Sequence, residues 1–322
     1  FYLISLSYLF AFSMGQLHLT WHYLQSKKKK QPDSILRDFP TVTIQLPIYN
    51  EKYVVERLLD AITKFDFPKE KMEIQILDDS TDDTTEIILR KLEVLRPLAL
   101  DIKLIHRENR IGYKAGALDH GFQSAKGDFI AIFDADFVPY PDFLKNTLAY
   151  FVNEQVGVVQ TRWGHLNKNY SLLTKLQAFG LDAHFSIEQM ARNHAGSFIN
   201  FNGTCGVWRK TCIADAGGWS NDTLTEDLDL SYRAQLKGWV FKYLGDITTP
   251  AELPVLMNAF KNQQFRWTKG AAECAVKNLP RVMQAKGMGF SDRVHAISHL
   301  MNTGIFIGIL SLTLSSIPLV YI

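Results

Sequence analysis

The stretch Gly127-Asp128-Phe129-Ile130-Ala131-Ile132-Phe133-Asp134-Ala135-Asp136 carries the clearest structural signal in the chain. Its apolar centre, from Phe129 to Phe133, is rich in strand-forming residues, and the run ends on two aspartates separated by one small residue. In open α/β sheets, ligands bind at the edge formed by the carboxyl ends of the parallel strands. The sequence therefore predicts a buried parallel strand that brings Asp134 and Asp136 to a ligand-binding edge.

The spacing of these two aspartates suits a shared cation. Two carboxylates two residues apart can hold a hard divalent ion, and such an ion commonly bridges carboxylates to substrate phosphates. Two unpaired acids inside an apolar sheet would be costly, which favours the rim of the sheet and a bound cation. Asp-x-Asp also occurs in ordinary solvated loops, so the pattern alone leaves both interpretations open.

The composition limits the class of protein. The 322 residues accommodate one large or two modest domains, and a hydrophobic content of 47% allows a sizeable core together with membrane segments. The formal net charge of +2 does not create the broad basic field of a nucleic-acid-binding protein. The three cysteines, Cys205, Cys212 and Cys274, form no CxxC pair, and their odd number favours free thiols in a reducing cytosol.

The first 25 residues predict a transmembrane helix. Residues 1–24 are apolar apart from Gln16, His18 and His22, and roughly 20 such residues suffice to cross a bilayer. Lysines follow at positions 27–30 in a basic linker over residues 26–38, which places this end on the cytoplasmic side. A signal peptide would carry its charges before the apolar run, and a solvated linker would explain the lysines in either case. Because residue 1 is Phe, we expect a longer parent protein.

Residues 297–322 contain no charged side chain and predict a second transmembrane helix. Arg281, Lys286 and Arg293 precede it and place its start on the cytoplasmic side as well. Over residues 281–296 we expect an interfacial segment that lies on the membrane. A cytosolic domain over residues 39–280 would then be held by a helix at each end, in a multi-pass protein of the cell (inner or plasma) membrane.

Between these ends, strand-like apolar runs alternate with amphipathic helical runs. The expected strands cover residues 41–46, 72–77, 101–105, 129–133 and 156–160. This alternation is typical of an α/β fold with a mostly parallel sheet and helices on both faces. Neither GxGxxG nor GxxxxGK[ST] follows a strand, which argues against a dinucleotide site and against a P-loop.

Polar residues follow several of these strands and would share one edge of the sheet. Acids such as Asp78 and Asp79 suit the hydroxyls of a nucleoside, and Lys114 at the start of a helix suits phosphate. Helix capping is the alternative explanation for the two acids. Asn50 is the expected N-cap of the helix that follows the first strand.

Four motifs occur in order along this half of the chain, and together they resemble the processive family-2 nucleotide-sugar glycosyltransferases, the cellulose synthase superfamily. The motifs are Pro47-Ile48-Tyr49-Asn50-Glu51, Asp78-Asp79-Ser80, Gly112-Tyr113-Lys114-Ala115-Gly116-Ala117-Leu118 and Asp134-Ala135-Asp136. Within that superfamily the chain is most similar to the cellulose-synthase-like mannan and glucan synthases of plants. The resemblance covers about residues 39–280 and implies a GT-A fold.

Two segments of the second half gain a function from this resemblance. Thr225-Glu226-Asp227 would by itself be a threonine cap with acids in the first helical turn, whereas in the family its aspartate is the general base. Gln263, Arg266 and Trp267 match the QxxRW motif that marks processive members. Without the resemblance, these three residues would belong to an amphipathic helix with a core tryptophan and a solvated arginine.

The segment Phe201-Asn202-Gly203-Thr204 is similar to the family's acceptor-sugar loop, although an Asn-Gly pair also favours an ordinary turn. A long helix over residues 172–192 is expected before it. The resemblance implies a complete set of site residues, as follows: Asp227 as the base; Asp134 and Asp136 for Mg²⁺ or Mn²⁺; Pro47, Tyr49, Glu51, Asp78, Asp79, Lys114, Gly116 and Arg266 for the donor; Asn202, Gly203, Thr204, Glu226, Gln263 and Trp267 for the acceptor.

The implied activity is that of a membrane-bound, inverting and metal-dependent hexosyltransferase. It would transfer a sugar from UDP-glucose or GDP-mannose to a growing β-linked glucan or mannan, with further membrane subunits as possible partners. Two alternatives remain open from the sequence. One is transfer of a single sugar to a membrane lipid, as in the related ceramide glucosyltransferases. The other is a non-catalytic membrane subunit that binds nucleotide sugars.

Overall fold

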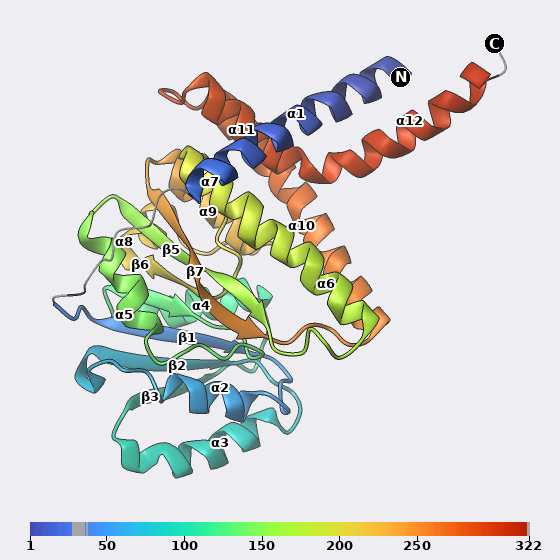
Figure 1. The fold of residues 1–322 in the computed structure, drawn as a ribbon. Helices are drawn as coiled ribbons and strands as arrows, with labels where there is room; N and C mark the ends of the chain where they lie inside the picture. Colours follow the sequence, from blue (N-terminus) through green and yellow to red (C-terminus); the bar gives the residue numbers. More distant parts are fainter. Residues whose placement is uncertain (28–35, 37, 321–322) are drawn as a thin grey trace.

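The computed structural model describes residues 1–27, 36 and 38–320 (Figure 1). Most of the predicted basic linker, including Lys28, Lys29 and Lys30, therefore lies outside the described residues. The three cysteines are all described, and each is a buried free thiol, as their odd number suggested.

A seven-stranded sheet forms the centre of the molecule (Figure 1). Its strands are β1 (Val42–Ile48), β2 (Met72–Asp78), β3 (Asp101–His106), β4 (Phe129–Ile132), β5 (Val156–His165), β6 (Gly206–Arg209) and β7 (Val240–Ala251). In space they follow the order β3-β2-β1-β4-β6-β5-β7. β6 runs antiparallel to both of its neighbours, and the other pairs are parallel, so the predicted mostly parallel α/β sheet is confirmed.

The strand order creates a switch point between β1 and β4. From β1 the chain steps outward through β2 to β3 and then returns to place β4 on the opposite side of β1. The two strands pair in parallel register, with Gln45 opposite Ile132, so their carboxyl ends lie at the same edge. Ligands of open α/β sheets bind at such a point. The aspartates that follow β4 are therefore at the position where the topology favours a ligand.

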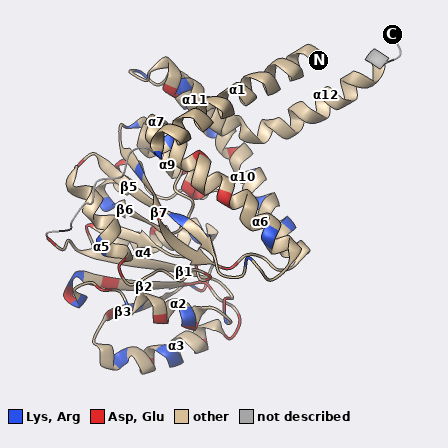
Figure 2. Ribbon diagram, viewed as in Figure 1, with Lys and Arg blue, Asp and Glu red and all other residues tan. Residues whose placement is uncertain are grey.

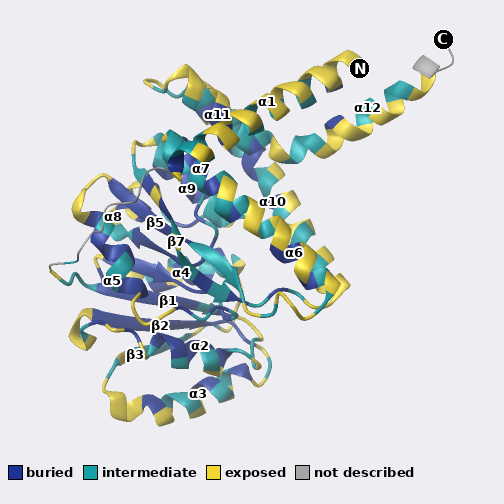
Figure 3. Cartoon of the chain, in the orientation of Figure 1, coloured by how far each residue is buried: buried dark blue, intermediate teal, exposed yellow. Residues whose placement is uncertain are grey.

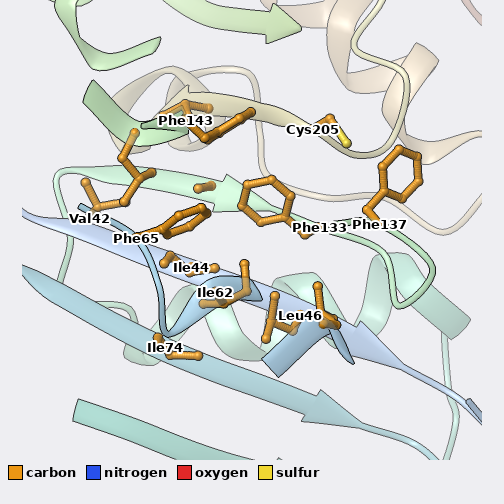
Figure 4. Packing of buried hydrophobic residues seen from close by; sticks show 14 of the residues in the cluster. Val42, Ile44, Leu46, Ile62, Phe65, Ile74, Phe133, Phe137, Phe143 and Cys205 are labelled. Carbon is orange, nitrogen blue, oxygen red and sulfur yellow. The ribbon is translucent and has the colours of Figure 1, made fainter. Parts of the chain in front are cut away.

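Alternating side chains of β1 serve opposite faces of the sheet. Val42, Ile44 and Leu46 point into a core shared with α2 (Val55–Ile62), α3 (Thr84–Leu95) and α5 (Phe143–Leu148) (Figure 4). The opposite face is covered by α4 (Tyr113–Ser124), α8 (Lys210–Asp215) and α9 (Glu226–Leu236). Figure 3 shows the sheet buried between these two layers. Each fully buried leucine or isoleucine contributes roughly 1.5–3 kcal/mol to this packing.

The turn after β1 differs from the prediction at Asn50. α2 begins at Val55, and Asn50 is not its N-cap but adopts a left-handed conformation with φ +56°. Its side-chain Oδ1 instead accepts a hydrogen bond of 2.8 Å from the backbone N–H of Thr81. This bond joins the loop after β1 to the loop after β2, and it stabilises the edge of the sheet rather than a helix.

The helix expected over residues 172–192 is present but interrupted. It consists of α6 (Leu172–Ala183), a π-helical turn over His184–Gln189 and α7 (Met190–Ala195). A π turn adds one residue to a helical turn, so residues before and after it no longer share the face that a 3.6-residue period predicts. Such turns are frequent at functional sites.

The two ends of the chain lie side by side and project away from the sheet (Figure 1). In α1 (Tyr2–Ser26) the Ser5 hydroxyl donates to Ser311 at 2.9 Å, and the Tyr8 hydroxyl donates to the Met301 carbonyl at 2.7 Å. Ser311 belongs to α12 (Gly304–Val320), which follows α11 (Phe290–Leu300). Figure 2 shows that α1 and α12 carry no charged residues, and their outward apolar side chains are largely exposed.

One helical stretch in the described part of the chain, Phe290–Pro318, is long and apolar enough to cross a membrane by length and composition. The sequence predicted two such helices. α1 does not meet the same measure, because Gln16, His18 and His22 lower its mean hydropathy. The multi-pass arrangement is therefore not established by the structure.

Candidate active site

Three separate segments meet around the carboxylate of Asp134. The Lys114 ammonium, in the first turn of α4, forms an ion pair with Asp134 and donates a 3.0 Å hydrogen bond to the carbonyl of Gly203. The Thr204 hydroxyl accepts a 2.9 Å hydrogen bond from the backbone N–H of Asp134. The edge of β4, the start of α4 and the loop before β6 thus form one wall.

Asp227 faces this wall from the start of α9. Gly203 has φ +78°, and a Cβ atom there would lie 3.1 Å from Asp227 Oδ2 and 3.4 Å from Lys114 Nζ. A side chain at position 203 would therefore crowd both groups and strain the backbone. Asp227, the predicted base, therefore lies across Gly203 from Lys114, which pairs with Asp134 of the predicted metal-binding pair. Asp134 and Asp227 are 93 positions apart in the sequence (227 − 134).

Burial controls the charge of the acids at the start of α9. Burial first, and then the neighbouring Glu226 carboxylate, raise the pKa of Asp227 to about 7. Burial also raises the pKa of Glu226. Burial alone would lower the pKa of Lys114, but the carboxylates of Asp134 and Glu226 outweigh it and raise that pKa. The lysine therefore stays cationic while Asp227 can exchange a proton near neutral pH, as a general base requires.

The predicted metal-binding acids share this environment. Burial, followed by the charge of Asp134, raises the pKa of Asp136 to about 7, and the same causes raise the pKa of Glu51 to about 7. Within the described residues, no group of three or more His, Cys, Asp or Glu side chains is arranged to hold a metal. The carboxylates of Asp134 and Asp136, with that of Glu51 close enough for its pKa to respond to Asp134, fit a hard cation that takes its remaining ligands from substrate phosphates and water.

The donor-side acids Asp78 and Asp79 lie at the same edge, but internal partners hold them. Asp79 receives two bonds from the Arg107 guanidinium, at 2.7 Å and 2.5 Å. Asp78 accepts from the backbone N–H of Ser80 at 3.0 Å and from the Thr85 hydroxyl at 2.6 Å. The structure does not bring either carboxylate into contact with the Lys114–Asp134 pair among the described contacts.

The other donor-side residues surround the loop after β1. The Arg110 guanidinium lies 3.2 Å from the centre of the exposed Tyr49 ring, and Pro47 is the penultimate residue of β1. Gly116 packs so closely that a Cβ atom there would lie 2.1 Å from the Ile111 carbonyl oxygen. Gly116 is therefore needed for the approach of α4 to the loop before it.

The QxxRW segment lies on α10 (Met257–Gln284), which packs against the start of α9. A Cβ atom on Gly270 would lie 2.6 Å from Thr225 Cγ2, so the two helices touch there. The ring of Trp267 lies 6.3 Å from that of Trp163, Gln263 is half-buried, and Arg266 is exposed. Burial raises the pKa of Glu226, and the positive charge of Arg266 partly opposes this rise. The Arg266 guanidinium is therefore near the Glu226 carboxylate.

The threonine cap that the pattern suggested at Thr225 is not formed. Thr225 occupies the N-cap position of α9 but makes no side-chain capping bond; its hydroxyl instead lies 3.3 Å from the Cys274 sulfur of α10. The side chain therefore joins α9 to α10. The Thr225 side chain therefore does not cap the first turn of α9, in which Glu226 and Asp227 lie.

A network of side-chain amides escaped the sequence analysis. Gln189 is the last residue of the π turn. Its Nε2 donates to the Asn200 carbonyl at 3.1 Å and lies 3.4 Å from Asn202 Oδ1. Asn200 Nδ2 donates to the same oxygen at 2.5 Å, and Gln160 Oε1 accepts from the Asn202 backbone N–H at 3.1 Å. These bonds fix the side chain of Asn202 beside Gly203. The π turn that supplies Gln189 leaves no periodic signal in the sequence.

A family model described as "Glycosyltransferase like family 2" matches residues 40–270. "Probable glucomannan 4-beta-mannosyltransferase 4" of Oryza sativa subsp. japonica is 42% identical over 264 residues, which is 80% of this chain and 48% of that protein. "Glucomannan 4-beta-mannosyltransferase 2" of Arabidopsis thaliana is 40% identical over 266 residues, which is 81% of this chain and 50% of that protein. The chain thus spans about half the length of these relatives.

Solved structures support the fold. The mannosyltransferase PcManGT from Pyrobaculum calidifontis, in complex with GDP-Man and Mn²⁺, has a TM-score of 0.75 at 21% identity, over 99% of this chain and 85% of that chain. S. aureus TarS 1-349 in complex with UDP-GlcNAc has a TM-score of 0.61 at 18% identity, over 82% of this chain and 72% of that chain. These likenesses support a GT-A-like sheet. The matched family model leads to the conclusion that this chain belongs to glycosyltransferase family 2.

Proposed function

We propose that the chain is the catalytic part of an inverting mannosyltransferase that extends a β-linked mannan or glucomannan from GDP-mannose. The observation that carries the proposal is the approach of Asp227 to the Lys114–Asp134 pair across Gly203. The names of the plant relatives support a mannosyl product, and the GDP-Man and Mn²⁺ of the archaeal structure support the donor and a divalent ion. UDP-glucose remains the second donor to test.

The chain's own residues provide the remaining parts of the reaction. The Asp227 carboxylate accepts the proton of the acceptor's terminal hydroxyl, whose oxygen attacks the anomeric carbon of the donor. Lys114 and Arg266 carry the positive charge that favours departure of the diphosphate. One displacement inverts the anomeric centre, so an α-linked donor yields a β-linked product.

A divalent ion, Mg²⁺ or Mn²⁺, is the cofactor that we propose for this site. Asp134 and Asp136 would hold it, and Glu51 lies close enough for its pKa to respond to Asp134. When bound, the ion would neutralise the charge of the donor diphosphate. In the structure Lys114 pairs with Asp134 and donates to the Gly203 carbonyl. With the ion on Asp134, the Lys114 ammonium would donate to phosphate oxygens of the donor or keep its bond to the Gly203 carbonyl.

The acceptor side would be formed by the loop of Asn202, Gly203 and Thr204 together with Trp267. The apolar C–H face of a sugar ring suits stacking on an indole, and the fixed Asn202 amide suits sugar hydroxyls. Glu226 lies beside Asp227 in the first turn of α9, and Gln263 lies on α10, which contacts the start of α9. On the donor side we retain Pro47, Tyr49, Glu51, Asp78, Asp79 and Gly116 as the residues that shape the nucleotide edge.

We further propose that residues 39–280 form the cytosolic catalytic domain and that residues 1–25 and 297–322 lie in the cell membrane. The exposed apolar side chains of α1 and α12 support a paired insertion, as do the hydrogen bonds from Ser5 to Ser311 of α12 and from Tyr8 to Met301 just before α12. Residues 281–296 would lie at the interface. A membrane location suits a product that must leave the cytosol.

The test is a donor screen on membranes that contain the protein. Labelled GDP-mannose and UDP-glucose are supplied with Mg²⁺ or Mn²⁺, and the product is analysed for size and linkage. We expect a β-linked, mannose-containing polymer, and no polymer from the Asp227→Asn variant. A single-sugar lipid product would replace the polymer proposal with the lipid-acceptor alternative. Intact donor with no hydrolysis or transfer would favour a non-catalytic binding subunit.

A further inference from the structure

A basic pocket lies outside the candidate active site, where α9 and α10 end and the chain turns into α11. It has a volume of about 390 Å³. Its polar lining consists of four cationic side chains and one amide, namely Arg233, Lys237, Arg281, Lys286 and Gln284. Among the described residues that line it, none is acidic. The pocket therefore has the charge of an anion-binding site.

Two of its cations are committed to the fold. Arg233 pairs with the buried carboxylate of Asp229 at 2.8 Å and also donates to backbone carbonyls at the end of α8. Lys237 pairs with Asp215 at 3.1 Å. These pairs anchor one side of the pocket, and their positive charge is largely balanced within the protein.

The other two cations are not balanced in this way. The Arg281 guanidinium donates to the side-chain oxygen of Asn278 at 3.1 Å, and no carboxylate within the described residues pairs with Arg281 or Lys286. Cations near a helix C-terminus can simply stabilise its last carbonyl groups. Arg281 lies in the last turn of α10 and Lys286 just beyond its end at Gln284, so this effect applies to both, but it leaves both charges without a carboxylate partner among the described residues.

The pocket adjoins the part of the chain that is suited to a membrane. Lys286 lies just before Phe290, the first residue of the candidate span. Phe290 is 86% exposed and Val294 is 44% exposed, whereas Ala296 and Leu300 are buried against α9 and α10. α11 therefore packs on the protein with one face and presents an apolar face outward, and that helix begins four residues after Lys286 of the pocket.

We propose that Arg281 and Lys286 bind a phosphate ester anion in this pocket, and that the headgroup of an anionic phospholipid supplies it. Guanidinium and ammonium groups are the usual protein partners of phosphate oxygens, and basic pockets beside membrane helices bind acidic headgroups. A soluble phosphate ester shares the same chemistry and is the other source. The site is separate from the QxxRW segment and does not depend on the proposed transferase reaction.

The test is native mass spectrometry of the detergent-purified full chain, titrated with phosphatidylglycerol or with phosphatidylcholine. The wild-type protein should retain phosphatidylglycerol in preference to phosphatidylcholine. Arg281→Ala/Lys286→Ala should retain it about 30-fold less, because each basic residue near an anionic membrane surface strengthens binding roughly fivefold. Both side chains make few contacts, so the melting temperature should not change.

The matched control is Lys64→Ala/Arg90→Ala, which removes two exposed cations near α2 and α3 at the opposite end of the molecule (Figure 1). It should retain phosphatidylglycerol as the wild type does. Glycerol 3-phosphate in excess distinguishes the two sources of phosphate. If it does not displace phosphatidylglycerol from the wild-type protein, the lipid is supported as the ligand. If it displaces phosphatidylglycerol from the wild type but not from the Arg281→Ala/Lys286→Ala variant, the pocket is assigned to a soluble phosphate ester. Equal retention by wild type and the pocket variant, or an equal loss in the control, overturns the proposal.

Discussion

Asp78 and Asp227 lie at the rim of the same sheet, but their carboxylates experience opposite surroundings. Burial alone would raise the pKa of Asp78, yet the hydrogen bonds from Ser80, Thr85 and His106 outweigh it and hold that pKa below its ordinary value. Asp227 is half-buried beside another acid, and desolvation together with the Glu226 charge raises its pKa to about 7. Hydrogen bonds to the charged form favour ionisation, whereas burial near like charge opposes it.

This difference separates acids that build the site from acids that can act in it. Asp78 has donors for both oxygens within the protein, so its charge is used to fix the loops after β2 and β3. Asp227 accepts a 2.8 Å bond from the backbone N–H of Leu228 with one oxygen, and its other oxygen faces Gly203. Sequence motifs mark both residues equally, so the surroundings are what distinguish them.

The largest effect should come from Asp227→Asn. An amide cannot accept the acceptor's proton, so polymer synthesis in membranes should fall by on the order of 1000-fold, within the range of general-base catalysis. Donor binding, measured by titration calorimetry with GDP-mannose and Mn²⁺, should change little. Asp119→Asn, which changes a half-buried carboxylate on α4 outside the proposed site, is the matched control; equal activity of the two variants would contradict the assignment of the base.

Loss of the proposed metal-binding pair, Asp134 and Asp136, should have the next largest effect. Asp134→Ala/Asp136→Ala removes the two carboxylates, so Mn²⁺-dependent binding of GDP-mannose should weaken on the order of 100-fold. Because burial raises the pKa of Asp136 to about 7, metal binding to the wild type should also weaken as the pH falls below 7. An unchanged calorimetric titration with Mn²⁺ present would exclude these residues as ligands.

Asp78→Asn should act on stability rather than on chemistry. The amide cannot satisfy the three donors that face Asp78, so the free energy of unfolding should fall by about 2–3 kcal/mol. The sign of the pH dependence sharpens the contrast. The folded pKa of Asp78 is depressed, so its stabilisation is present above about pH 4 and is lost as the pH falls through its folded pKa.

The opposite sign is expected for Asp227, whose folded pKa is raised. Its neutral form is favoured by the fold, so the stabilisation is complete below about pH 4 and is lost as the pH rises through about 7. Asp227→Asn should therefore not destabilise the protein at pH 8. Denaturant unfolding of the two variants across this range measures both signs, and parallel pH profiles would contradict the comparison.

The smallest effect in the series, about tenfold between pH 7 and pH 6, is the pH dependence of the wild-type reaction. Since Asp227 must be ionised to act as a base, kcat/KM should be constant above about pH 7 and should fall about tenfold per pH unit below it. Initial rates of mannosyl transfer at saturating Mn²⁺ measure this limb. A profile that is flat down to pH 5 would show that the general base has a pKa below 5, which contradicts the value of about 7 for Asp227.

The strands and the order of their polar ends were predictable because they depend on local signals. Residues 129–133 form a continuous apolar run, and the acids after it can lie only at the end of that strand. Lys114 was predicted at the start of a helix in the same way, and it lies in the first turn of α4. Parallel pairing then brings these ends to one edge without any further information.

The second half of the site was less predictable because it depends on contacts between distant segments. The π turn at Gln189 interrupts the helical period, and the contact of Thr225 with Cys274 replaces an expected cap. Asn50 was assigned to a helix N-terminus, but its left-handed backbone and its bond to Thr81 serve the neighbouring loop. Local patterns carry no signal for these tertiary choices. The role of Asp227 was inferred from resemblance, since its own tripeptide is also a common cap.

The reversed direction of β6 has a consequence for how this enzyme family can vary its substrates. An antiparallel strand starts at the edge where its neighbours finish, and Gly206 is opposite Ile132, the last residue of β4. The segment that leads into β6, residues 201–205, therefore arrives directly beside Asp134. Had β6 been parallel, the same segment would have entered from the far edge of the sheet. If residues 201–205 hold the acceptor as we propose, a change in this short segment would alter the acceptor side of the site while the strands of the sheet keep their register.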